Sequence, residues 1–159
     1  MSQREADEAL FATFGRDLVA AAEASVGPWV VRAVTERSGG ALSDEVAARA
    51  NEAATAATVA VVAGLTELIE TDIDQQRTTP LGVIRQAAQF ATAVLDREGA
   101  PAVARDPDAV RLQPDDRYDL TIGSFSELSD ELQEAGIKWG AGKAHLHLAR
   151  RRAEERARG

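Results

Sequence analysis

The sequence contains no cysteine and few aromatic residues, and both absences limit what the chain can do. Without cysteine it can form no disulfide, thiolate nucleophile, iron–sulfur cluster or cysteine-ligated zinc site. Aromatic residues make up 4% of the chain, whereas alanine supplies much of a hydrophobic fraction of 45%. Because alanine has the lowest intrinsic cost in a helix, this composition favours tightly spaced helices over a core of bulky side chains.

An uninterrupted apolar run of membrane-spanning length is also missing. Residues 1–8 carry acids where a secretory signal would be apolar. The longest apolar run, residues 56–65, is interrupted by Thr58 and Gly64 and is shorter than a membrane span. At 159 residues the chain fits one domain, so we expect a single cytoplasmic domain over residues 1–159 without a membrane partner.

Helical periodicity dominates the first part of the chain. Apolar residues recur at three- and four-residue steps over residues 6–24, and Gly27-Pro28 predicts a break before a short second helix. Ser43 is the expected N-cap of a long central helix over about 44–73. Its apolar middle predicts the most buried helix of the fold, with a short buried strand over residues 59–62 as the alternative.

A further helix is expected to begin at Pro80 and to end at Gly99. Residues of about 100–122 contain three prolines and several aspartates without a helical period, which predicts an irregular arm that Tyr118 and Leu120 pin to the domain. Gly136 is then expected to join a short helix to a basic helix over about 137–156. The predicted fold is all-α: a compact bundle of about five or six helices, with a proline- and aspartate-rich loop before a C-terminal helical hairpin.

Charge is distributed unevenly along this acidic chain, whose net charge is −8. Residues 98–134 carry ten acids and three arginines, whereas residues 138–159 carry seven bases and two acids. We expect the acidic arm and the basic tail to dock, within one subunit or between two, beside an apolar anchor at Trp139 and Leu146. The predicted interaction residues are Trp139, Lys143, Arg150, Arg151 and Arg152 on the basic helix, with Asp115, Asp116 and Asp119 in the arm.

Polar residues elsewhere in the sequence give weaker indications of a functional site. His145 and His147 are two positions apart on a predicted helix, where side chains point in nearly opposite directions, so the pair cannot share a metal ion. Carboxylates gather at the end of the long helix, and a solvated helix end is favoured there over a cation site. Those carboxylates are Glu67, Glu70, Asp72 and Asp74. We therefore predict no metal and no cofactor.

Two further groups of residues have a structural and a functional interpretation. Asn51, Thr55 and Thr58 form a polar stripe on an apolar helix, which indicates a helix-register device or an exposed face, with a ligand pocket as the alternative. The sequence contains no phosphate loop, dinucleotide fingerprint or catalytic-triad signature. Gly136, Gly140 and Gly142 are accordingly predicted to be close-packing positions.

The favoured function is a non-catalytic protein-interaction or regulatory module that associates with itself, as a homodimer, or with another protein. Nucleic-acid binding through a helix-turn-helix-like C-terminal hairpin is an alternative. The acids of its first helix, and the position of the arginines at the far end of its second, count against it. An enzyme whose helical-bundle site has no recognisable signature is the remaining alternative.

Overall fold

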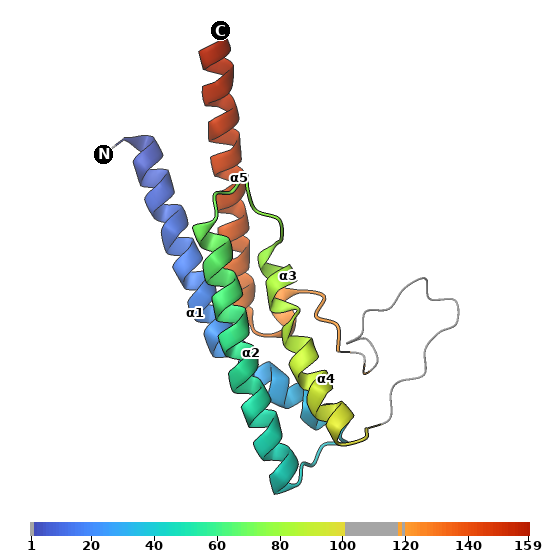
Figure 1. Ribbon diagram of the computed structural model, residues 1–159. Helices are drawn as coiled ribbons and strands as arrows, with labels where there is room; N and C mark the ends of the chain where they lie inside the picture. The colour runs from blue at the N-terminus through green and yellow to red at the C-terminus, as the bar shows by residue number, and fades with distance from the viewer. Residues whose placement is uncertain (1, 101–117, 119) are drawn as a thin grey trace.

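The computed structural model describes residues 2–100, 118 and 120–159 (Figure 1). Its elements are α1 (Gln3–Arg37), α2 (Asp44–Glu70), α3 (Pro80–Ile84), α4 (Ala87–Arg97), the 3-10 turn η2 (Phe125–Glu127) and α5 (Asp130–Arg158). No strand occurs among these residues, so the all-α prediction is confirmed and the alternative strand over 59–62 is wrong. The bundle is compact, but it is built from four helices and the five-residue α3, so the predicted count of five or six long helices is not confirmed.

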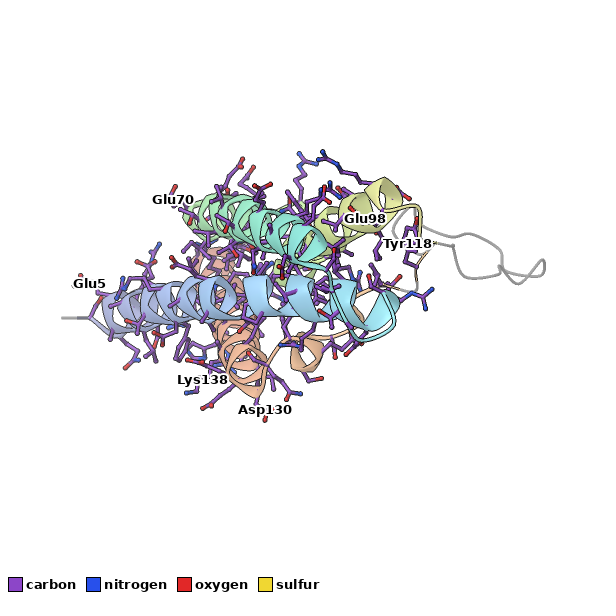
Figure 2. The ribbon with its side chains drawn as sticks, turned by 90° about the horizontal axis from the view of Figure 1, so that it is seen from below. Glu5, Glu70, Glu98, Tyr118, Asp130 and Lys138 are labelled. Carbon is purple, nitrogen blue, oxygen red and sulfur yellow. The ribbon has the colours of Figure 1, made fainter. Side chains whose placement is uncertain are left out.

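Helix α1 lies at the centre of the bundle and packs against α2, α4 and α5 (Figures 1 and 2). Its apolar stripe is fully buried at Leu18, Val26, Val30 and Val34. The turn after α1 is tight because Gly39 and Gly40 have φ angles of 88° and 93°, which favour glycine. This turn returns the chain along α1, so that α2 lies beside it.

The predicted break at Gly27-Pro28 is wrong, because α1 continues through Pro28. A proline normally disfavours helical backbone in the residue before it, through a clash with that residue's Cβ. Here that residue is Gly27, which has no Cβ. Pro28 itself is exposed, so the carbonyl that loses its helical partner lies near water.

Helix α2 differs from the sequence-based prediction in length and in burial. It ends at Glu70 instead of about residue 73, because Thr71 adopts extended backbone and its hydroxyl caps the carbonyl of Glu67 at 2.8 Å. It buries a single stripe of six residues, whereas α1 buries nine, so α1 is the central helix. The buried residues of α2 are Ala50, Ala54, Ala57, Val61, Leu65 and Leu68. The opposite face of this apolar helix is directed to solvent.

Instead of the predicted C-terminal hairpin there is one helix, α5, which runs from Asp130 through Gly136 to Arg158. The Ser129 side chain caps its start by accepting a hydrogen bond from the Leu132 amide at 3.0 Å. Gly136 does not turn the chain but lets α5 pack closely: a Cβ there would lie 2.5 Å from the Phe125 ring. The basic segment is therefore the second half of a helix whose first turn is acidic.

Most of the predicted arm, residues 101–117 and 119, lies outside the described residues, and with it lie Asp115, Asp116 and Asp119. The two expected pinning residues are described, and both are buried. The hydroxyl of Tyr118 donates a hydrogen bond to the carboxylate of Asp96 on α4, while Leu120 belongs to the main core cluster. The predicted pinning by Tyr118 and Leu120 is confirmed.

Candidate interaction site

Trp139 lies on the face of α5 that packs against α1. It is 3% exposed, and its ring centroid is 5.3 Å from that of Phe11. The ammonium of Lys143 sits 5.5 Å from the indole centroid, a cation–π contact within the chain. Leu146, the second proposed anchor, is also buried. The structure therefore places this predicted apolar anchor in the core, where it fixes α5 to α1.

Arg150 is engaged by carboxylates of its own chain, in the segment that follows α2. Its guanidinium donates to Asp72 at 2.8 and 3.0 Å and to Asp74 at 2.7 Å. The hydrogen bond from Arg150 is the main reason that the pKa of Asp72 is lowered, and the same contacts raise the pKa of Arg150. We call this group the Arg150 lock, because it ties the second half of α5 to the end of α2.

The Arg150 lock includes only two of the four carboxylates in the predicted cluster. Asp72 and Asp74 face α5, whereas Glu67 and Glu70 are exposed on α2. Among the residues that the structure describes, no group of three or more histidine, aspartate and glutamate side chains is arranged to hold a metal ion. Two of the four carboxylates, Asp72 and Asp74, are thus the acidic partners of Arg150 on α5.

The two histidines of α5 meet different neighbours, as their spacing requires. His145 Nε2 lies 3.1 Å from a carboxylate oxygen of Asp7 on α1, and His147 Nδ1 lies 3.1 Å from Asp74. The pKa of Asp7 is lowered, first by a hydrogen bond from Gln3 and then by His145. Each histidine therefore contacts a different neighbouring segment, His145 the helix α1 and His147 the residues after α2.

Arg151 and Arg152 begin the exposed end of α5. Figure 1 shows this end extending beyond the adjacent ends of α1 and α2. Residues 151–159 are all exposed, and within the described part of the chain neither guanidinium has an ion-pair partner. Of the predicted arginine cluster, these two remain available for a partner.

The polar stripe of α2 lines an open groove between α1 and α2. Asn51, Thr55 and Thr58 are brought together there beside Pro28 and Val31 of α1. Thr55 donates to the Asn51 carbonyl at 3.1 Å and Thr58 to the Ala54 carbonyl at 2.8 Å, so both hydroxyls are satisfied within their own helix. The groove does not include Glu67 or Glu70. The stripe therefore forms a polar border of this groove.

Several large apolar side chains lie in water on the long helices, which the sequence analysis did not single out. Val59 on α2 is 65% exposed, Ile137 on α5 is 62% exposed and Leu148 on α5 is 44% exposed. Their spacing along each helix is visible in the sequence. Which apolar face the neighbouring helices leave uncovered depends on tertiary packing, so no sequence signal distinguishes these residues from core residues.

Helix α2 is long and apolar enough to cross a membrane, the one such helix in the described residues, and 28% of its most apolar stretch is buried. Core helices of globular proteins have the same length and composition, so this property alone is weak evidence. Comparisons with protein-family models, curated proteins and solved structures found no match.

Proposed function

We propose that this protein is a non-catalytic interaction module that self-associates through apolar helix faces left open by the bundle. The observation that carries the proposal is the exposure of Val59, Ile137 and Leu148 on helices whose other faces are packed. Burying such side chains is favourable by roughly 1.5–3 kcal/mol each. Exposed apolar positions grouped on one face are a common mark of protein interfaces.

The absence of charge around Val59 supports the proposal. Between Ala53 and Thr66, α2 carries no charged residue on any side, so its outward face lacks the groups that normally keep a surface helix in water. A symmetric dimer is the commonest way for one chain to cover such a face, because the same patch serves both subunits. We further propose a cytoplasmic location for this assembly.

Sedimentation of the purified chain across a wide concentration range tests the proposal. We expect the mass to rise from that of the 16.9 kDa monomer toward twice that value as concentration increases from low to high micromolar. The rise should persist in moderate salt, because apolar burial is not screened. A constant monomer mass at every concentration would remove the self-association on which the proposal depends.

Nucleic-acid binding is less well supported. The helix-turn-helix outline that it requires is replaced by the continuous α5. Arg150 is occupied by Asp72 and Asp74, and the first turn of α5 carries Asp130 and Glu131, which would repel phosphates.

A further inference from the structure

We propose that His145 and His147 make the attachment of the C-terminal half of α5 sensitive to pH. This half, residues 145–158, is called the distal half of α5 below. It is held firmly against the rest of the bundle at about pH 5.5, where histidine is charged, and more loosely at about pH 8, where histidine is neutral. The proposal concerns a single chain and goes beyond the proposed self-association.

The distal half of α5 has few apolar contacts with the rest of the protein. Within residues 145–158, all of which the structure describes, Leu146 alone is buried. An open groove of about 580 Å³ lies between these residues and the first turns of α1, so apolar side chains do not fill that seam. Figure 1 shows both chain ends at this end of the bundle. Polar contacts therefore decide how firmly the distal half is held.

Histidine takes part in two of those polar contacts. The chain has two histidines, and both lie in the distal half, one on each side of Leu146 in the sequence. His145 Nε2 and His147 Nδ1 each lie 3.1 Å from a carboxylate oxygen, on Asp7 and on Asp74. The third contact is the Arg150 lock. The two carboxylates belong to different segments, so the histidines attach the distal half on two sides.

On the α1 side, His145 faces one negative charge that no other side chain balances. The partner that Asp7 has on its own helix is the neutral amide of Gln3, which donates a hydrogen bond at 2.8 Å. The nearest other charges of α1 are Arg4 and Glu8, which pair with each other at 3.3 Å. A proton on His145 would therefore balance the charge of Asp7.

The charge facing His147 is also one negative charge in excess. The segment after α2 presents two carboxylates, Asp72 and Asp74, and both are bonded to the single guanidinium of Arg150. Two negative charges thus meet one positive charge. A proton on His147 makes this group neutral.

The remaining charges near the histidines do not change this balance. Lys143 and Arg151 lie four residues before and after His147 on the same helix. They stay beside it whether or not the distal half is attached, so their repulsion cancels in the comparison. The other element that packs against α5 is η2, which lies at the beginning of the helix beside Gly136, away from both histidines.

The direction of the pH effect follows from linkage. The pKa of Asp7 is lowered from 3.8 by Gln3 and then by His145, and that of Asp72 by Arg150, so both stay ionised where histidine titrates, between about pH 5 and pH 8. A neighbouring carboxylate favours the charged form of histidine. The attached state therefore binds protons more tightly, and attachment weakens as the pH rises through this range. A neutral imidazole can still donate one hydrogen bond, so the distal half is loosened and not released.

Hydrogen exchange of the backbone amides tests the proposal, with rates corrected for the intrinsic effect of pH and the chain kept dilute enough to be monomeric. We expect amides in the distal half to be protected more strongly at about pH 5.5 than at about pH 8, by about twofold for each histidine pair and about fourfold together. Amides in the first half of α5, which is anchored by Trp139, are the internal reference and should show no such change.

Variants assign the effect to the two pairs. Glutamine keeps a donor but does not titrate, so His145→Gln and His147→Gln should each remove about half of the pH effect on a logarithmic scale, and the double variant all of it. Asp7→Asn should act as His145→Gln does, and combining these two should add nothing further. Arg151→Gln is the matched control, because it changes a charge of the distal half that has no ion-pair partner in the described structure.

Three results would overturn the proposal. They are equal protection of the distal half at both pH values, a pH effect that survives in the double glutamine variant, and an equal change in both halves of α5. Circular dichroism of each variant establishes that the helices remain folded. None of these results bears on self-association, which sedimentation measures separately.

Discussion

The glycines of α5 show how one missing methyl group can have opposite consequences along a single helix. A Cβ at Gly136 would lie 2.5 Å from the Phe125 ring, whereas a Cβ at Gly140 meets no described residue within 4 Å. We therefore expect Gly136→Ala to lower the free energy of unfolding by about 1–3 kcal/mol through overpacking. Gly140→Ala should raise it by about 0.5–1 kcal/mol through helix propensity. Urea unfolding followed by circular dichroism measures both.

The two variants control each other, because each adds the same methyl group to the same helix. Measurements at low concentration keep any dimer from contributing. Equal stabilisation by both substitutions would contradict the prediction and would mean that Phe125 can withdraw from α5 at no cost.

At the scale of single residues, the sequence predicted local backbone geometry better than it predicted which side chains are exposed. Ser43 caps α2 as expected, and Gly99 follows α4 with a φ of 70°. The close-packing role predicted for the α5 glycines holds at Gly136 and Gly142 but not at Gly140. Caps and turns follow from local backbone chemistry, whereas contacts such as that of Trp139 with Phe11 depend on segments far apart in the sequence.

At the scale of elements, the Arg150 lock predicts how stability changes with acid. The pKa of Asp72 is lowered from its usual value of 3.8, so the lock stabilises the fold fully above that pH. Its contribution is lost as the pH falls below 3.8 through the lowered pKa of the folded state. We expect the melting temperature of the unmodified chain to fall as the pH is lowered through this range. The melting temperature of Arg150→Gln should be lower at neutral pH and should fall less on acidification.

Arg151→Gln is the matched control for this experiment. It removes the same charge one residue along α5, from a side chain without an ion-pair partner in the described structure. At concentrations where the chain is monomeric, the melting temperature of Arg151→Gln should follow that of the unmodified chain at every pH. Identical pH profiles for Arg150→Gln and the unmodified chain would mean that the exposed lock contributes nothing to stability.

Helix boundaries were harder to predict than helices. Gly27-Pro28 and Gly136 both look like interruptions, yet α1 and α5 run through them. In each case tertiary contacts outweigh local preference, because the apolar stripe continues on both sides and the glycine fits against a neighbour. At Gly27 that neighbour is α2, where a Cβ would lie 3.4 Å from the Thr58 hydroxyl.

At the scale of the whole molecule, the all-α class followed from composition and periodicity, and the structure confirms it. Composition and periodicity did not predict which helix lies at the centre. The apolar middle of α2 favoured deep burial, but α1 takes the centre because α2, α4 and α5 pack on it, whereas α2 contacts α1, α4 and the five-residue α3. A sequence shows how apolar a helix is, but not how many sides its neighbours cover. The open faces of α2 and α5 are therefore visible only in three dimensions.

The overall charge of the molecule argues against general binding to nucleic acid. The net charge is −8, and the free arginines of α5 share their helix with Asp130, Glu131 and Glu134. We expect the chain to pass through a duplex-DNA column at low salt, where phosphate contacts are strongest. A triple variant with lysine at these three acids should be retained, which would show that the column detects a basic α5. Retention of the unmodified chain, with a salt dependence reduced by Arg151→Gln, would instead assign the exposed end of α5 to phosphates.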